Sequence, residues 1–519
     1  MNSKNKLLLM ILILLACSFG LTQEIFDPIY ADIDIWAAQG YCKLIYNIRP
    51  YAPQVLLAIL EEVSINGDDR AKEKAQHYIK KLTRYDIGFE INSNNTLLAG
   101  TADDYRGITG IAFNLFLEPV DKLLCKVHAG AYLIDGQSKF YPYGTGEPID
   151  IHEDSVYLLP PLISGDNTAI LYTLTSYSWY GESSFWISAG LGRNSAGPFF
   201  DNGIFIGPQA RQTANWGLNF TAGQFTFSTL LLQLTAVTRN ANKYAIYHDY
   251  SFRINDNLKI GLVETVIFGG EFKPQYLLPI TAFFYQQSMT SGALYADNSL
   301  AGGYIVWNMP NGLVVRGSLF LDDINPFDYV KLLFDTKTIG AMQIGFLWAP
   351  LNSVVKKISG DYTAVFPYMY AHHYTTGEDN YTHMGASLGA GLLPNSDRFE
   401  LALDWNLLNL ATTMRILRHG NASEGVYSGT GDYWDDGWVN GKPTYQPPYP
   451  SGTTPKYFRF LSQQVIQTVF QFEIKTTVEL LNNILLDVGY CFEYHSNYNL
   501  QQGVDANLHY LSVLCKYVF

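Results

Sequence analysis

The sequence is poor in charge, in cysteine and in long apolar runs. Charged residues make up 16% of the 519 residues, below the roughly one quarter that is usual for a soluble domain. The five cysteines show no C-x-x-C spacing, which argues against a site of the zinc-finger type. The net charge is −13. This excludes a general nucleic-acid binder, which needs a basic face to displace counterions.

Four of the cysteines lie beyond the apolar N-terminus, and two of these fall in late strand patterns. Cys17 belongs to the N-terminal run, whereas Cys42, Cys125, Cys491 and Cys515 follow it. A disulfide between Cys491 and Cys515 and a pair of free thiols are both compatible with the spacing.

Aromatic residues and glycine are abundant instead. The chain has 37 Tyr, 30 Phe and 44 Gly. An outer-membrane barrel uses such residues, because half of each strand faces lipid and aromatic girdles mark both interfaces. A secreted β-solenoid or β-sandwich would share this composition, so composition alone does not decide.

The N-terminus has the pattern of a secretory signal. Lys4 and Lys6 precede an almost wholly apolar run from Leu7 to Leu21. This run of about 15 residues is shorter than the about 20 of a spanning helix. Cleavage near Gly20 to Gln23 would make residues 1–22 a signal peptide. The alternative is a loose lipobox that ends at Cys17 and makes it a lipidated N-terminus.

The C-terminus resembles the closing strand of a barrel. Counting back from Phe519, alternate positions hold Tyr517, Cys515, Val513 and Leu511. Such a strand presents one face to lipid and one edge to the first strand. An ordinary last strand of a soluble protein is the alternative.

Residues 23–86 are predicted to be a helical segment in the periplasm. Asp27 caps a helix that has Pro28 in its first turn and ends at Gly40. A second helix is expected from about Pro53 to Val63, and a third, rich in Lys and Arg, from Asp68 to Arg84. A solvated face explains the basic third helix better than a contact with anionic lipid.

From about residue 87 the apolar period changes to two, which predicts a barrel over residues 87–519. Residues 399–407, 470–474 and 486–494 alternate apolar and polar side chains over about one membrane crossing each. Asn482-Asn483 suits a hairpin turn. At about 24 residues per strand the region holds roughly 18 antiparallel strands, around a lumen that is polar unless something fills it.

Residues 419–457 are predicted to be a long loop, outside the cell or folded over the pore. Glycine, proline and aromatic residues are spread along its whole length. Aromatic faces suit sugar C–H surfaces, and short polar groups suit sugar hydroxyls. Mutual packing of the aromatics as a plug, and Ca²⁺ binding by the aspartates, are the alternatives, and no cofactor or resident metal is expected. The candidate glycan-binding residues are Tyr427, Tyr433, Trp434, Trp438, Tyr445, Asp432, Asp435 and Asp436.

Glu264 falls in the apolar phase of Leu258, Ile260 and Leu262. A carboxylate that faces lipid is costly, so a register change is expected there. Glu264 would then face the lumen. The interpretation is a structural charge network, with a transport site as the alternative, and its expected members are Arg253, Glu264, Asp297, Asp322 and Asp323.

Residues 385–389 match the G-x-S-x-G pattern, with His383 close by. A hydrolase elbow needs a strand-to-helix turn, and no helical pattern follows here. On one continuous strand His383 and Ser387 would lie roughly 13 Å apart. A triad assembled across strands remains the alternative. His372 and His373 could join His383 at a metal, but a place in the aromatic girdle suits them better.

Several short motifs resemble the capsule-assembly Wzi-type outer-membrane proteins in their order and spacing. They are Ala31-Asp32-Ile33, Arg49-Pro50-Tyr51, Gly192-Arg193, Gly197-Pro198, Gly261-Leu262-Val263-Glu264-Thr265, Tyr276-Leu277-Leu278-Pro279, Tyr381-Thr382-His383-Met384-Gly385, Pro394-Asn395-Ser396-Asp397 and Arg418-His419-Gly420. The resemblance implies a barrel of about 18 strands closed by helices and loops. It also implies a non-catalytic role in holding capsular or exopolysaccharide.

The resulting expectation is a non-enzymatic barrel in the outer membrane that anchors surface polysaccharide. Its expected partners are that polysaccharide, outer-membrane lipid and the barrel-assembly machinery, and not nucleic acid. A porin for small solutes or sugars is the first alternative, and a lipid-modifying barrel enzyme is the second.

Overall fold

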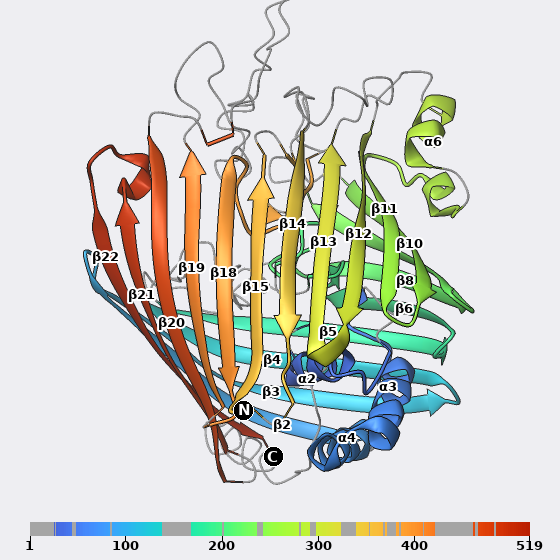
Figure 1. Cartoon of the computed structure of the whole chain (residues 1–519), viewed down its shortest axis with the longest axis horizontal. Coiled ribbons are helices and arrows are strands. Elements are labelled where there is room, and N and C mark those ends of the chain that lie inside the picture. Colours follow the sequence, from blue (N-terminus) through green and yellow to red (C-terminus); the bar gives the residue numbers. More distant parts are fainter. Residues whose placement is uncertain are drawn as a thin grey trace, which may run out of the picture.

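The computed structural model describes eighteen strands that close into one antiparallel barrel (Figure 1). The described residues are 25, 27–43, 48–83, 86–136, 168–199, 202–235, 242–279, 282–290, 297–322, 339–351, 353–366, 369–370, 380–383, 386–407, 409–420, 460–461, 465–481 and 484–518. The predicted signal peptide, the Asn482-Asn483 turn and nearly all of the 419–457 loop lie outside them.

Each barrel strand pairs with the next one along the chain. The first nine are β2 (Asp86–Gly100), β3 (Asp104–Val120), β4 (Leu123–Gly136), β5 (Thr168–Glu182), β6 (Phe185–Gly192), β8 (Thr213–Ala222), β9 (Phe225–Thr235), β10 (Asn242–Asn255) and β11 (Leu258–Gly269). The last nine are β12 (Asn298–Met309), β13 (Leu313–Asp322), β14 (Ile339–Trp348), β15 (Val355–Val365), β18 (Ser396–Trp405), β19 (Leu410–Gly420), β20 (Ile466–Leu481), β21 (Ile484–Ser496) and β22 (Ala506–Val518).

The C-terminal strand closes the barrel, as its pattern predicted. β22 pairs with β2 in a continuous register from Glu90 opposite Val518 to Gly100 opposite Leu508. No helix among the described residues is both long and apolar enough to span a membrane.

Side chains alternate between the outer face and the lumen along the strands of the wall. On β14, Ile344 is 60% exposed on the outer face, whereas its neighbour Gln343 is 2% exposed on the lumen side. Cys491 is buried and pairs in register with Tyr510, whereas Cys515 is exposed and pairs with Leu486. The disulfide alternative is therefore wrong, and both thiols are free.

The connections divide the barrel into two ends. At one end neighbouring strands join through hairpin turns such as residues 121–122, 183–184, 223–224 and 256–257. We call this the short-turn end. At the opposite end, the loop end, longer segments leave the wall, including 193–212 and 366–395.

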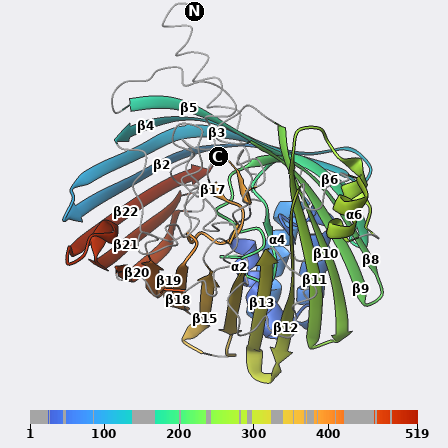
Figure 2. The same ribbon diagram turned by 90° about the horizontal axis from the view of Figure 1, so that it is seen from above.

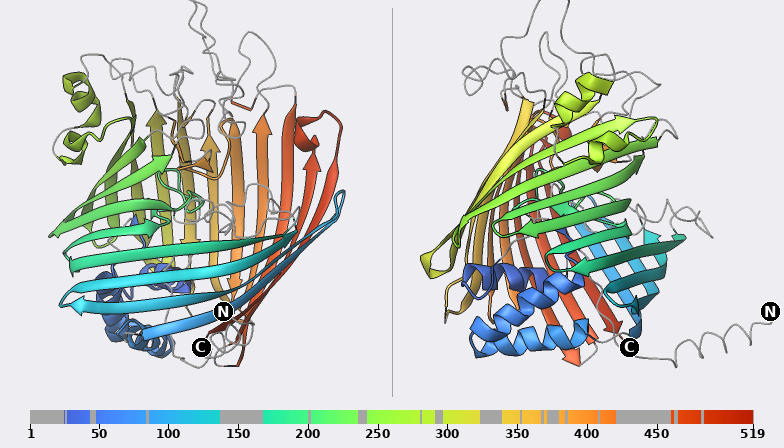
Figure 3. Two further views of the ribbon diagram at one scale, coloured as in Figure 1. Left: turned by 180° about the vertical axis from the view of Figure 1, so that it is seen from behind. Right: turned by 90° about the vertical axis from the view of Figure 1, so that its right-hand side faces the viewer.

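Three helices lie at the short-turn end, and together they form the helical plug (Figures 1 and 3). They are α2 (Pro28–Ala38), α3 (Pro53–Asn66) and α4 (Asp69–Leu82). The predicted cap at Asp27 is present, since its side chain accepts from the Ile29 amide at 3.0 Å. Asp68 caps α4 in the same way and accepts from the Ala71 amide at 2.8 Å. Gly40 follows α2 with φ +79°, a conformation that favours glycine.

The helical plug is fastened to the barrel by a buried carboxylate. Asp32 on α2 lies 2.6 Å from Lys74 on α4 and 3.2 Å from Lys356 at the start of β15, and it accepts from the Tyr78 hydroxyl at 2.7 Å. Burial opposes its ionisation, but Lys356 and Lys74 outweigh burial and hold the pKa of Asp32 below its ordinary value. The helices also share an apolar core with lumen-facing wall residues, among them Trp179 and Trp186.

Candidate functional site

Two segments from the loop end fold back into the lumen and fill it with an apolar core. They are the described parts of 193–212 and of 366–395, and together we call them the inner plug. Figure 2 shows β17 (Ala386–Ser387) inside the ring of strands. Buried residues of the inner plug, such as Phe205 and Leu388, form one cluster with wall residues, such as Tyr304 and Phe320. The Phe205 and Phe320 rings meet edge to face at 5.1 Å.

Tyrosine hydroxyls bind the two segments to each other. Tyr370 donates to the Ile204 carbonyl, and Tyr381 donates to the Phe205 carbonyl, both at 2.8 Å. The two tyrosine rings stack at 5.4 Å. Burial raises the pKa of both phenols far above the ordinary value, so they remain donors at any physiological pH. The two segments of the inner plug are therefore held together by hydrogen bonds as well as by apolar packing.

The wall holds the inner plug through polar contacts from several strands. The Lys243 ammonium donates to the Thr382 carbonyl at 2.8 Å. Gln343 donates to the Asn202 carbonyl at 3.1 Å, and Arg316 donates to the Pro198 carbonyl at 3.0 Å. The three donors lie on β10, β13 and β14, so they hold the inner plug against one side of the barrel.

His383 binds the wall through one ring nitrogen and the other segment of the inner plug through the other. Its Nδ1 accepts from the Thr235 amide at 2.9 Å, and its Nε2 lies 3.3 Å from the Gln212 carbonyl. Burial and the nearby Lys243 ammonium lower the pKa of His383 to about 3. The ring is therefore neutral in the folded protein.

Acidification is expected to loosen the inner plug at His383. The unfolded imidazole takes up a proton near its ordinary pKa of 6.5, whereas the folded one does so only near 3. The stabilising contribution is complete above pH 6.5 and falls as the pH drops, by up to about 2 kcal/mol at pH 5. Amide exchange over 380–392, corrected for the intrinsic effect of pH, should therefore rise between pH 7 and pH 5.

A His383→Gln variant provides the control, because glutamine does not titrate. Its exchange over the same segment should change little with pH. Equal pH dependence in both proteins would refute the role given to His383.

The rest of the lumen wall carries a chain of ion pairs that the sequence alone does not predict. Arg415 on β19 lies 2.5 Å from Glu400 on β18 and 2.8 Å from Glu473 on β20. Arg398 extends the chain to Asp361 on β15 at 3.7 Å. The alternation had placed Glu400 and Glu473 in the polar phase, but pairing them required the strand register. We call these residues the ionic ladder.

The predicted lumen network of Arg253, Glu264, Asp297, Asp322 and Asp323 is wrong as a single site. Arg253 and Asp322 face the lumen at opposite ends of the barrel, and Asp323 lies outside the described residues. Asp297 instead binds Lys273 at 2.6 Å, ahead of β12.

Glu264 stays in the outward phase, and the expected register change is absent there. β10 and β11 pair without interruption from Lys243 to Arg253, and the shift lies between Arg253 and Asn255. The helix α6 (Phe283–Thr290) covers Glu264 from outside the ring (Figure 2). The carboxylate accepts from the Phe283 amide at 3.0 Å and from the Tyr250 hydroxyl at 2.9 Å. The start of α6, rather than a bulge in the strand, therefore shields this outward-facing carboxylate from lipid.

The G-x-S-x-G segment belongs to the inner plug and not to a barrel strand. β16 (Thr382–His383) and β17 form a small hairpin in which Thr382 pairs with Ser387. The Ser387 hydroxyl accepts from the Gly389 amide at 3.1 Å. Both ring nitrogens of His383 contact main-chain groups, so the closeness of His383 and Ser387 in the sequence is explained by the packing of the inner plug. His372 and His373 lie outside the described residues, as do all eight candidate residues of the 419–457 loop.

No family model and no curated protein matches this sequence. Among solved structures the chain is similar to Wzi of Escherichia coli, described as an outer-membrane protein involved in group 1 capsule assembly and a carbohydrate-binding β-barrel. That match has a TM-score of 0.60 and 12% identity, and it covers 96% of this chain and 99% of that one. The OprD protein of Pseudomonas aeruginosa matches with a TM-score of 0.44 and 10% identity, over 84% of this chain and 94% of that one. The chain therefore has the fold of an outer-membrane β-barrel.

Proposed function

We propose that this chain is a non-catalytic outer-membrane protein that binds polysaccharide and holds it at the cell surface. The observation that carries the proposal is the filled lumen. An inner plug and a helical plug occupy it at two levels, each with an apolar core shared with the wall. A barrel built in this way suits surface binding better than solute passage. The carbohydrate binding described for Wzi, which shares the fold, agrees with this proposal.

The orientation follows from the two ends of the barrel. Outer-membrane barrels carry short turns on the periplasmic side and long loops on the outer side. We therefore assign the helical plug to the periplasm and the loop that follows β19 to the cell surface. Lipid and the barrel-assembly machinery would be its other partners.

The aromatic loop is the proposed glycan contact. Trp434 and Trp438 are flanked by Asp432, Asp435 and Asp436 in the sequence. Indole faces pack on sugar C–H surfaces, and carboxylates accept from sugar hydroxyls. Aromatic anchors of this kind contribute about 2 kcal/mol or more each to binding.

Deletion of the gene in its native host is expected to shed polysaccharide into the medium while total synthesis stays unchanged. The measurement compares the polysaccharide on washed cells with that in the medium. Alanine at Trp434 and Trp438 should reproduce part of the loss, because about 2 kcal/mol corresponds to roughly 30-fold weaker binding. Trp307→Ala, on the outer face of β12, is the matched control and should retain polysaccharide. Unchanged cell-bound polysaccharide in the deletion strain would refute the anchoring role.

A further inference from the structure

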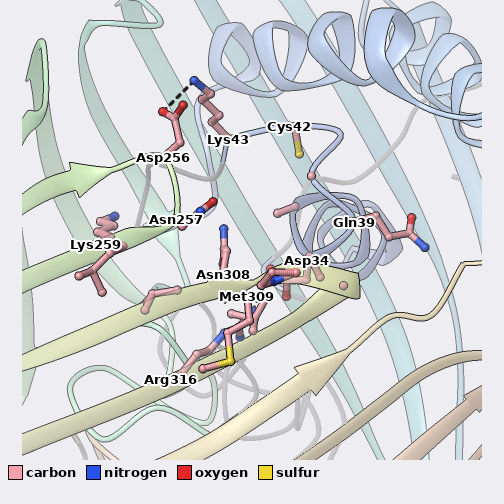
Figure 4. Close-up of a pocket in the computed structure, with 18 of the residues that line it drawn as sticks. Asp34, Gln39, Cys42, Lys43, Asp256, Asn257, Lys259, Asn308, Met309 and Arg316 are labelled. Carbon is pink, nitrogen blue, oxygen red and sulfur yellow. Dashed lines mark hydrogen bonds and ion pairs between the residues drawn. The ribbon is translucent and has the colours of Figure 1, made fainter.

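A pocket lies at the short-turn end, between the helical plug and two hairpins of the barrel wall. Its volume is about 430 Å³, within the about 300–1,000 Å³ range of small-molecule sites. α2 and the turn after it line one side, and the β10–β11 and β12–β13 hairpins line the other. Figure 4 shows Asn257, Lys259 and Asn308 on the hairpin side, opposite Asp34 and Gln39 of the helical side.

The pocket carries more positive than negative charge. Its cations are Lys43, Arg253, Lys259 and Arg316, and its carboxylates are Asp34 and Asp256. Both carboxylates already have cationic partners. Asp256 pairs with Lys43 at 3.0 Å, and Asp34 pairs with Arg49, which lies outside the lining, at 3.1 Å.

Arg253 is the cation most available to a ligand. It forms no ion pair among the residues that the structure describes, and its side chain is half-buried on the lumen face of β10. A guanidinium in this position offers a planar fork that matches a carboxylate or phosphate with two hydrogen bonds. The charge balance of the pocket therefore favours an anionic ligand.

The uncharged lining favours a ligand rich in hydroxyl groups. Asn255, Asn257, Asn308, Asn311 and Gln39 all contribute to it. Each carboxamide offers both donors and an acceptor, as a sugar hydroxyl requires. A bare anion would use the cations and leave most of these groups without a role.

We propose that this pocket binds a sugar unit that carries an anionic group, with Arg253 and Lys259 on the anion and the carboxamides on the hydroxyls. The site is separate from the surface loop of the proposed function, and it lies where the helical plug meets the wall. A ligand here would contact both α2 and two wall hairpins.

The test is calorimetric titration of the purified full-length protein in detergent with glucuronate, glucose and inorganic phosphate. Glucuronate should bind at least about tenfold more tightly than glucose or phosphate, because only glucuronate offers both anion and hydroxyls. Arg253→Gln should weaken glucuronate binding at least about tenfold and leave glucose unaffected. Lys259→Gln provides a second variant on the neighbouring strand. Correct folding is checked by the heat-dependent gel migration of closed barrels.

Lys122→Gln is the matched control, because Lys122 lies in the β3–β4 turn at the same end of the barrel but outside the pocket. It should bind glucuronate as the native protein does. The Trp434→Ala and Trp438→Ala variants should also bind it normally, so this assay and the retention assay can fail independently. Equal binding of glucose, equal binding of phosphate, or no binding of glucuronate would each overturn the proposal.

Discussion

Replacing Arg415 with alanine is expected to lower the free energy of unfolding by about 3–5 kcal/mol. The guanidinium donates to Glu400 at 2.5 Å and to Glu473 at 2.8 Å. The three side chains are at most 16% exposed. Without Arg415, two carboxylates face each other in a poorly solvated part of the wall. The measurement is reversible unfolding in urea, in detergent or lipid vesicles, followed by tryptophan fluorescence.

Two further variants separate charge from packing. Adding Glu473→Gln to Arg415→Ala should recover part of the loss, because it removes one of the two carboxylates that Arg415 bridged and leaves Glu400 with Arg398. Lys122→Ala breaks an exposed pair with Glu182 and should leave the unfolding curve unchanged. An Arg415→Ala protein as stable as the native one would mean that water solvates the ionic ladder in the membrane.

Purified native protein is expected to show little conductance in planar bilayers. A barrel of about 18 strands encloses a water-filled channel when nothing occupies its lumen, but here two plugs do. A variant that lacks residues 27–83, and in which a short glycine–serine linker replaces 380–392, should conduct at least about tenfold more. Either change alone should have a smaller effect, because the other plug remains.

The controls concern folding of the barrel. Each variant must show the same heat-dependent gel migration as the native protein before its conductance is interpreted. Steady conductance of the native protein would contradict the filled lumen and favour the porin alternative. In that case the inner plug would act as a constriction that leaves a path beside it.

The sequence by itself determined the architecture, because its signals are local and periodic. Alternation of apolar and polar residues predicts strands, and the strand length predicts membrane crossings. The helix cap at Asp27, followed by Pro28, is read from the chain directly. Two carboxylates of the ionic ladder, Glu400 and Glu473, also fall in the polar phase of alternating runs.

Only the tertiary structure decided what fills the lumen and which charges meet. The inner plug comes from two segments about 170 residues apart, and neither has a regular period that would predict burial. Glu264 shows the same limit: the register change predicted to turn it into the lumen was wrong, because α6 covers it on the outer face, and a strand pattern cannot predict that cover. Arg415, Glu400 and Glu473 likewise meet only through the register of three strands. Periodicity predicts whether a side chain faces lipid or the lumen. Its partner comes from another strand or segment, and the two meet only when the barrel has closed.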